Sequence, residues 1–514
     1  MMSRLLSIIL VAVLLLLLIV GLVKFNDLPY ETPAPSTEGD QTLLPNETDD
    51  EFYDRYDFGG EEIGIIMSGF RDATRCITLP EGEDDTHSVN VAVANRNKMV
   101  EELLDVKIVP YGTVSADRMV DHMREYFSAP DTKYDIVGLY QYYDLGLAYS
   151  DESAFIDIGN YSSKGVSLDP DVDYWDYTSY ELLSYGGASY LITGDLSQSW
   201  VKSMYVSYVN ADILNKYKDQ IKTLTGYDDI YELVYSGNWT VELWCQLNEI
   251  VHVNSDGDES LTTAADQHGF LGYSAPESSI NNFIVDGFLA GCHVTFSKLG
   301  YRGVPEIDYN NKVLKAYSDA MVSLYGDSRS CFVDYESDKN SVQYFSEGKT
   351  LVTIGTIGDA EKLADMTAGY YILPPPKANS EQRDYYTMTG DSSNFFGIPK
   401  KSENSDAAVL TLKALGYYSK KIVTPEIYDI ALKGRYTRGD AEAEKASAMI
   451  DYIRSKIYSD FLVLFKQSTS GSPVFYHREK VGNSIITSEA VVMRQTWKNE
   501  LDKILEELEP KAKP

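Results

Sequence analysis

Histidine and cysteine are scarce in this sequence of 514 residues, which contains six of the first and four of the second. The histidines form no H-x-x-H or H-E-x-x-H pair, and the cysteines form no C-x-x-C pair. Zinc sites and metallohydrolases use these spacings, so we expect neither a metal nor another cofactor. In an exported chain the cysteines can form up to two disulfides, in three full pairings, or remain buried thiols; they are Cys76, Cys245, Cys292 and Cys331.

Motifs for nucleotide binding and for serine nucleophiles are also missing. The sequence has no Walker loop, no G-x-G-x-x-G fingerprint and no G-x-S-x-G elbow. Paired carboxylates for glycoside hydrolysis stay open, because 78 acidic residues guarantee chance pairs and their separation depends on the fold. The segment Asn254–Glu259 resembles a calcium loop, but Thr263 stands where the loop needs its last glutamate, so an exposed acidic turn is expected.

Basic residues are outnumbered, with 45 Lys and Arg against 78 Asp and Glu and a formal net charge of −33. A charge of this sign repels the phosphate backbone, so nucleic acid is not an expected partner. Hydrophobic residues make up 44% of the chain, which is typical of packed globular proteins. Because single cores stop growing at roughly 250–300 residues, the length predicts at least two lobes.

One long apolar run stands at the amino terminus. Residues Leu5 to Val23 carry no charge and lie between Arg4 and Lys24, which is enough to span a bilayer. The run is longer than a signal-peptide core and no A-x-A site or nearby cysteine follows it. Residues 1–24 are therefore a membrane anchor or a signal sequence, with an uncleaved anchor favoured, and the proline-bearing residues 25–58 are predicted to be a disordered spacer.

The folded pattern begins at Glu61–Met67, a short apolar run typical of a buried strand. Helical periodicity over 89–104, strand character over 106–109, another helix over 115–127 and a strand over 134–139 follow. This alternation predicts a parallel α/β sheet. Ligands of such sheets lie outside the carboxyl ends of the strands, which makes the residues directly after Leu139 candidates.

Those residues are rich in tyrosine. The segment Tyr140–Asp144 offers three phenol rings, one amide and one carboxylate, a set that suits a sugar ring, since the apolar face stacks and the hydroxyls need hydrogen bonds. The whole chain has 40 Tyr but only 17 Phe. Tyr140, Tyr143 and Asp144 are thus candidate ligand contacts, although the rings can equally serve only to cover the end of the sheet.

A second candidate junction lies at Gly194. An apolar strand from Ser189 runs into Gly194-Asp195, and strand character resumes at Met204 after Trp200. A strand that pauses at glycine is typical of a crossover between lobes, because a hinge needs residues that absorb changes in φ and ψ.

Motifs distributed over residues 60–460 give the sequence a resemblance to bacterial extracellular solute-binding proteins of the maltose-binding type, the sugar-capturing subunits of ATP-driven importers. No motif is specific alone, but their order and spacing match. They are Arg96-Asn97, Tyr134–Val137, Gly194–Ser197, Tyr208–Leu214, Ser236–Thr240, Asp266–Gly269, Phe345–Lys349, Leu373–Lys377 and Gly397–Lys400.

The resemblance implies two α/β lobes joined by crossing strands, a hinge and a ligand in the cleft between the lobes. It implies a first lobe of residues 59–194 and 391–435, and a second of 195–390 and 436–514. Position by position, it places Tyr140, Tyr143 and Asp144 at the sugar and Asp195 at the first crossover. Asp391, Ser392 and Asn394 fall at the return crossing. The aromatic often found in the loop at Gly355–Asp359 is missing here, which leaves solutes other than sugars open.

The function we expect is extracellular capture of a small solute, foremost an oligosaccharide, for delivery to the permease subunits of an ABC importer. Tyr140, Tyr143, Trp200 and Asp391 are the expected principal contacts. We expect a monomer without enzymatic activity, held at the cell surface by the amino-terminal helix. Relatives are usually anchored through a lipidated cysteine, so a membrane-anchored ligand sensor stays open, as does a glycan-degrading enzyme with paired carboxylates.

Overall fold

The structure is a computed structural model, and it divides the chain into two compact units, Met1–Phe52 and Tyr53–Pro514. The first unit lies outside the residues that the structure describes. Within the second unit the described residues are 56–69, 75–77, 87–150, 154–163, 165–184, 187–257, 265–273, 282–308, 310–327, 329, 331–332, 341–433, 440–465, 473–481 and 486–508.

Four strands form a first sheet in the order β12-β3-β1-β2, and we name this sheet with the helices packed on it the first lobe. The strands β1, β2 and β3 are parallel, as predicted, and β12 runs antiparallel to β3. Their bounds are β1 Glu61–Gly69, β2 Val106–Ser115, β3 Ile136–Tyr140 and β12 Asn394–Gly397. Because β1, β2 and β3 share one direction, their carboxyl ends meet at one edge of the sheet.

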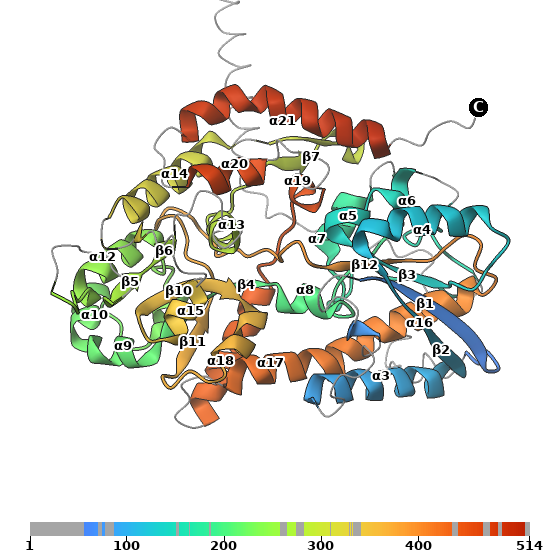
Figure 1. The fold of residues 1–514 in the computed structure, drawn as a ribbon, viewed down its shortest axis with the longest axis horizontal. Coiled ribbons are helices and arrows are strands. Elements are labelled where there is room, and N and C mark those ends of the chain that lie inside the picture. Colours follow the sequence, from blue (N-terminus) through green and yellow to red (C-terminus); the bar gives the residue numbers. More distant parts are fainter. Residues whose placement is uncertain are drawn as a thin grey trace, which may run out of the picture. The chain divides into compact units, whose positions relative to one another are not determined.

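Helices cover both faces of the first sheet (Figure 1), with α4 on one face and α3 with α16 on the other. The apolar stripe of α3 ends in Val100 and Leu104, both fully buried, which explains why this segment docks on the sheet. The helices of this lobe are α3 Ser88–Leu104, α4 Ala116–Ser128, α5 Gln141–Asp144, α6 Leu147–Ser150, α7 Tyr177–Leu183 and α16 Ser405–Tyr418.

A second sheet has the order β11-β4-β10-β5 and forms the centre of the second lobe. Every residue of β4 is buried, and β4 pairs antiparallel with both β10 and β11. Strand bounds are β4 Tyr205–Asn210, β5 His268–Phe270, β10 Thr350–Thr356 and β11 Tyr370–Leu373; two-stranded pairs are β6 Gly272–Tyr273 with β9 Cys331–Phe332, and β7 Ser297–Leu299 with β8 Pro305–Ile307.

Side chains cap the amino-terminal ends of four helices in the second lobe, α9, α11, α12 and α14. Thr240 accepts a hydrogen bond from the Leu243 amide at 3.1 Å and starts α12. The bounds are α9 Ala211–Lys216, α10 Lys218–Thr225, α11 Ile230–Tyr235, α12 Val241–Val251, α13 Asn282–Gly291, η4 Tyr301–Gly303, α14 Asn311–Gly326, α15 Ser341–Ser346 and η5 Ile357–Leu363.

Three segments connect the lobes. In the first, Ile192 pairs with Phe396 of the first sheet, and Met204 then pairs with Thr389 before β4 begins. The return segment runs from Thr389 to β12. The third is a helical run in which α16 continues through the π-helical η6 Ser419–Val423 into α17 Thr424–Lys433, which packs on η5. The strand predicted from Ser189 is reduced to isolated bridges, since only Ile192 and Gly194 find partners.

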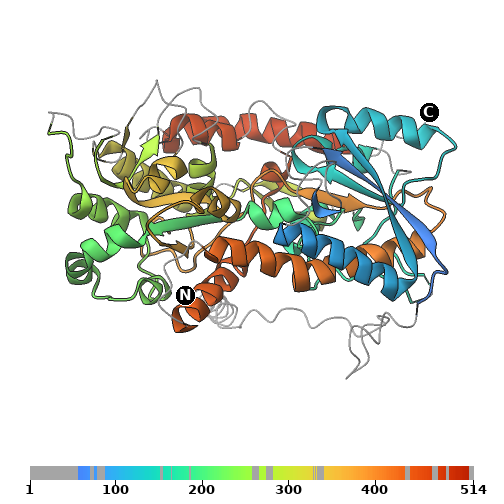
Figure 2. The same cartoon turned by 60° about the horizontal axis from the view of Figure 1, so that its bottom comes forward.

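The first connection also contains α8 Gln198–Lys202. Four helices end the described part of the chain. These are α18 Asp440–Arg454, α19 Phe461–Leu464, α20 Pro473–Lys480 and α21 Ile486–Leu508. The longest, α21, lies on the opposite side of the described unit from α16 and α17 (Figure 2).

Two predictions concern the amino-terminal run and the cysteines. The predicted membrane span, Leu5 to Val23, lies outside the described residues, and among the described helices none is long and apolar enough to cross a bilayer. Cys76, Cys245 and Cys292 are free thiols. Of the two alternatives for the cysteines, the structure therefore favours unpaired thiols over disulfides.

Candidate functional site

The carboxyl ends of β1 and β3 meet the beginning of β12 in a belt of polar side chains. Asn394 pairs with Tyr140 across the two strands, and the backbone N–H of Asn394 donates to Ser197 Oγ at 3.0 Å. Gln198 follows Ser197 and donates to the Arg75 carbonyl at 2.9 Å. Residues that are far apart in sequence, from β3, the first connection and the return segment, are thus brought to one place.

Several buried polar atoms of this belt have no hydrogen-bond partner in the part of the chain that the structure describes. They are Ser68 Oγ, Asp144 Oδ1, Gln198 Oε1, Ser393 Oγ and both amide atoms of Asn394. An unsatisfied buried polar group costs about 1–3 kcal/mol, and proteins rarely carry several together without a function.

Asp144 is fully buried at the end of α5. Its Oδ2 accepts a hydrogen bond from the Tyr140 amide at 2.9 Å and so fixes the turn from β3 into the helix. Burial raises the pKa of Asp144 to about 6, although the hydrogen bond from the Tyr140 amide lowers it in part. Its second oxygen is the unsatisfied one, which leaves one acceptor for a ligand.

Three tyrosines form a cluster at the same edge. The ring centroids of Tyr142 and Tyr143 lie 4.9 Å apart in a T-shaped pair, and the Tyr140 ring lies 6.0 Å from that of Tyr143. Tyr143 is 44% exposed, whereas Tyr140 is buried. Burial, followed by the charge of Asp391, raises the pKa of Tyr142, which places Asp391 close to this cluster. The rings present an aromatic surface beside the polar belt.

The second lobe contributes further charged groups. Arg478 of α20 forms an ion pair with Asp286 of α13, with Nε donating to Oδ1 at 2.8 Å, and both side chains are buried. The Tyr205 hydroxyl donates to Asp286 at 3.2 Å. These groups border a small cavity of about 10 Å³, which is lined by Tyr205, Asp286, Leu289, Phe296, Met388, Thr389, Gly390, Asp391, Val463 and Val474.

The cavity is small for its position. A volume of about 10 Å³ has room for about one water molecule, so a solute of several rings does not fit the space as it stands.

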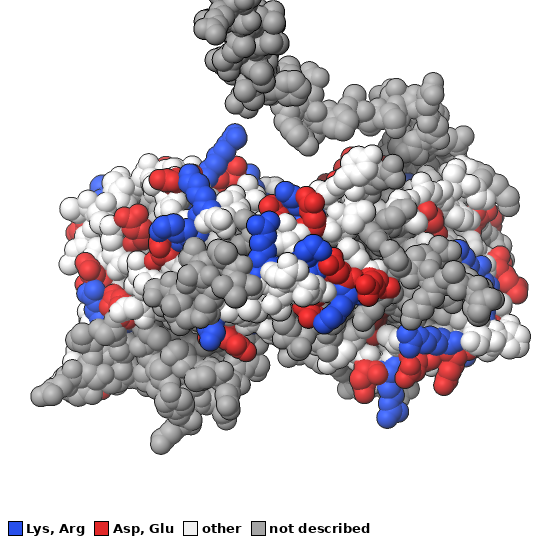
Figure 3. Space-filling view, turned by 90° about the horizontal axis from the view of Figure 1, so that it is seen from above, with Lys and Arg blue, Asp and Glu red and all other residues white. Residues whose placement is uncertain are grey.

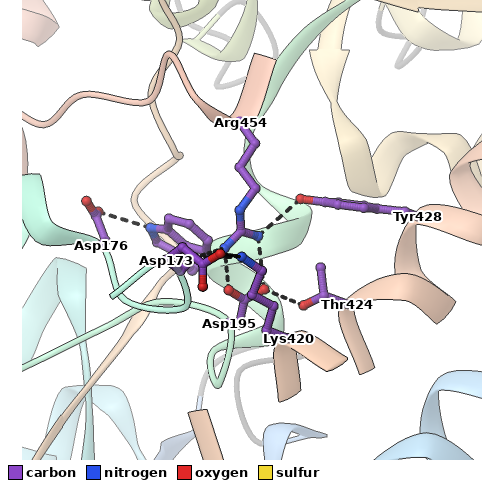
Figure 4. A network of polar contacts seen from close by, with 8 residues as sticks. Asp173, Asp176, Asp195, Lys420, Thr424, Tyr428 and Arg454 are labelled. Atoms are coloured by element: carbon purple, nitrogen blue, oxygen red, sulfur yellow. Dashed lines mark hydrogen bonds and ion pairs between the residues drawn. The ribbon is translucent and has the colours of Figure 1, made fainter. Parts of the chain in front are cut away.

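Asp195 lies at the centre of a buried network (Figure 4). Arg454 Nη1 donates to its Oδ1 at 2.9 Å, Arg454 Nη2 donates to its Oδ2, and Thr424 Oγ1 donates to Oδ1 at 2.5 Å. Burial alone would lower the pKa of Arg454, but the Asp195 carboxylate raises it well above its usual value. The network joins the first connection to α17 and α18, and protein groups occupy both carboxylate oxygens.

Trp200 belongs to the same network. Its Nε1 donates to Asp176 at 3.1 Å, and the Arg454 guanidinium lies 5.1 Å from the ring centroid. Such a desolvated cation–π contact contributes up to about 2 kcal/mol. The indole is buried within the protein, and the ligand contacts expected of Trp200 and Asp195 stay predictions.

The eight predicted site residues therefore fall into two groups. Tyr140, Tyr143, Asp144 and Asn394 lie along the polar belt, with Asp391 and the partly exposed turn residue Ser392 on the return segment beside them. Asp195 and Trp200 form the separate network. Ser68, Gln198 and Ser393 were not predicted from the sequence, although Ser68 directly continues the apolar run of β1 and so marks its carboxyl end.

The acidic turn offers no further site among the described residues. Asn254 Oδ1 accepts from the Gly257 amide at 2.6 Å, and residues 258–259 lie outside the described ranges. No group of three or more His, Cys, Asp or Glu within those ranges is arranged to hold a metal ion.

No protein-family model matches the chain, and no curated protein matches its sequence. Solved structures do match. The galacto-N-biose/lacto-N-biose I-binding protein of the ABC transporter from Bifidobacterium longum, in complex with lacto-N-biose, is 13% identical with a TM-score of 0.51, covering 88% of this chain and 100% of its own. The chain has the fold of the extracellular solute-binding proteins.

Two further structures with this solute-binding fold are similar to the chain. A family 1 extracellular solute-binding protein from Bifidobacterium longum subsp. infantis is 14% identical over 87% of this chain and 99% of its own, with a TM-score of 0.49. The ABC substrate-binding protein of Listeria monocytogenes in complex with cycloalternan is 14% identical over 88% and 100%, with a TM-score of 0.47. The fold assignment rests on the first structure, and the predicted two-lobe α/β architecture is confirmed.

Proposed function

We propose that this chain captures a small polyhydroxylated solute, foremost an oligosaccharide, between its two lobes and delivers it to the permease of an ABC importer. The observation that carries the proposal is the belt of unsatisfied buried groups at Ser68, Asp144, Gln198, Ser393 and Asn394. These atoms come from four chain segments that meet at the carboxyl edge of a parallel sheet, where ligands of α/β folds bind.

The chemistry of the belt favours a neutral, hydroxyl-bearing ligand. Four of its five residues are hydroxyls or amides, which both donate and accept hydrogen bonds as sugar hydroxyls do. The adjacent Tyr140, Tyr142 and Tyr143 offer ring faces for the apolar face of a sugar. The name of the Bifidobacterium longum structure, a disaccharide-binding protein of an ABC transporter, supports the same class of solute.

We further propose that the apolar run Leu5 to Val23 anchors the protein, with residues 25–58 as spacer and the lobes outside the cell as a monomer. Nineteen uncharged residues between Arg4 and Lys24 support this part. Fractionation after high-salt and carbonate washes tests it: the full chain should stay with the membrane, and a chain starting at residue 56 should be released.

Isothermal titration of residues 56–514 against neutral oligosaccharides and polyols tests the capture function. At a ligand concentration 100 times Kd, binding should also stabilise the protein by about 2.7 kcal/mol in a thermal-shift assay. Asn394→Ala should weaken binding by tenfold or more, whereas Asn215→Ala, an exposed asparagine of α9, should leave it unchanged. The proposal fails if no neutral glycan binds, or if both variants bind like the parent chain.

A further inference from the structure

The carboxyl-terminal helices contact both lobes. α19 packs on α7 of the first lobe and on β7 of the second, and α21 packs on α14 and β8 but also on α6 of the first lobe. In Figures 1 and 2, α21 runs from the side of α14 toward α6, where the described chain ends. A single helix of 23 residues therefore bridges the lobes on the side away from α16 and α17.

Its attachment to the second lobe combines buried polar and aromatic contacts. Asp460, just before α19, is buried and accepts hydrogen bonds from the amides of Phe296 at 2.8 Å and Ser297 at 2.9 Å. Trp497 of α21 is fully buried, and its ring lies 5.7 Å from that of Tyr476 in α20. Hydrogen bonds of buried carboxylates and large buried rings make this a firm attachment.

The attachment at the first lobe is apolar and shorter. The last turns of α21 carry Ile504 and Leu508, both buried, and the partly buried Leu505, which joins the same core. Nearby, the Phe465 ring after α19 lies 6.4 Å from Tyr149 in α6. Apolar contacts of this kind have no fixed hydrogen-bond geometry to break, so they can release and re-form.

The outer face of α21 carries charges that pair along the helix. Lys498 lies 2.7 Å from Asp502, and Lys503 lies 2.9 Å from Glu500. Seen from above, basic and acidic side chains are interspersed over this face of the molecule (Figure 3). These exposed ion pairs face water, so it is the apolar face of α21 that packs against the lobes.

We propose that α21 is a strap across the cleft, fixed to the second lobe and docked reversibly on α6. The carboxyl-terminal helices α19 and α20 border the cavity, since Val463 of α19 and Val474 of α20 line it. The cavity is too small for a solute of several rings, so such a solute can enter only when the lobes separate. Because α21 is fixed to the second lobe, its last turns must then leave α6. The use of the strap rests on the proposed capture function, but its existence can be tested without any ligand.

The test compares the ligand-free chain with Leu505→Ser/Leu508→Ser by small-angle X-ray scattering and hydrogen exchange. The radius of gyration should increase. The amides of Gln141–Asp144 in the first lobe and of Thr389–Gly390, which line the cavity, should exchange more than about tenfold faster. Lys498→Ser, on the exposed face of the same helix, is the matched control and should change neither quantity.

Two further measurements guard against a variant that fails to fold. A chain that ends at residue 503 keeps Trp497 and Leu501 and should open in the same way. In the parent chain, residues 504–508 should exchange faster than the residues around Trp497. Unchanged scattering and exchange in both variants, or equal protection along α21, would overturn the strap, whereas loss of solute binding alone would bear only on the proposed function.

Discussion

Replacing Arg454 with methionine should destabilise the protein strongly, because it leaves a carboxylate buried without its counterion. The Asp195 side chain is 0% exposed and that of Arg454 is 14% exposed. Removing one partner of such a pair costs about 3–5 kcal/mol, since the remaining charge stays out of water. Methionine keeps most of the apolar stem over Trp200, so the charge is the main change.

Urea unfolding followed by circular dichroism measures this loss, because urea, unlike guanidinium, does not screen the charges. Lys420→Met is the matched control. Lys420 pairs with Asp173 at the surface, where a lost ion pair costs about 0–1 kcal/mol. Asp195→Asn combined with Arg454→Met should recover part of the loss, since no charge is then left buried. A loss from Arg454→Met no larger than that from Lys420→Met would refute the reasoning.

Three other predictions concern buried groups. Burial raises the pKa of Asp144 from its ordinary 3.8 to about 6, so its ionisation lowers stability as the pH rises from about 4 to 6, by up to about 3 kcal/mol. Asp144→Asn should remove this dependence in melting curves between pH 4 and 7, and an unchanged curve would contradict the burial argument. Asp460→Ala should cost about 3–5 kcal/mol in urea unfolding, because the Phe296 and Ser297 amides lose their acceptor; a loss below about 1 kcal/mol would count against it. Gly64→Ala should prevent normal packing, since its Cβ would lie 1.9 Å from the Lys133 carbonyl oxygen, and a melting temperature within about 2 °C of the parent would contradict this.

The parallel sheet of the first lobe could be predicted from the sequence because its signals are local. Apolar runs such as Ile136–Leu139, followed by a polar segment, show both the strand and its carboxyl end within a few residues. That locality is why the amino-acid sequence alone was enough to place Tyr140, Tyr143 and Asp144 at the edge of the sheet.

The partners of Asp195 could not be predicted. Arg454 lies 259 residues further along the chain and Thr424 lies 229 residues away, and neither pairing leaves a periodic pattern in the sequence. The sequence pattern of a glycine followed by an aspartate at a crossover is the same whether the aspartate contacts a ligand or a buried arginine. Only the fold shows that Arg454 reaches it.

The unsatisfied atoms of Gln198 and Asn394 were equally out of reach of sequence reasoning. Whether an amide is satisfied depends on every neighbour that surrounds it, and here those neighbours come from β3, α8 and the return segment. Sequence named Asn394 through a family resemblance, whereas burial without a partner gives it a physical reason to bind a ligand.

A ligand-bound structure tests the capture function most directly. The account predicts that hydroxyl groups of a solute lie within about 3.2 Å of Asn394, Gln198 and Ser68, with a ring of the solute against the cluster of Tyr140, Tyr142 and Tyr143. A solute bound away from these residues, with the polar belt filled only by water, would contradict it.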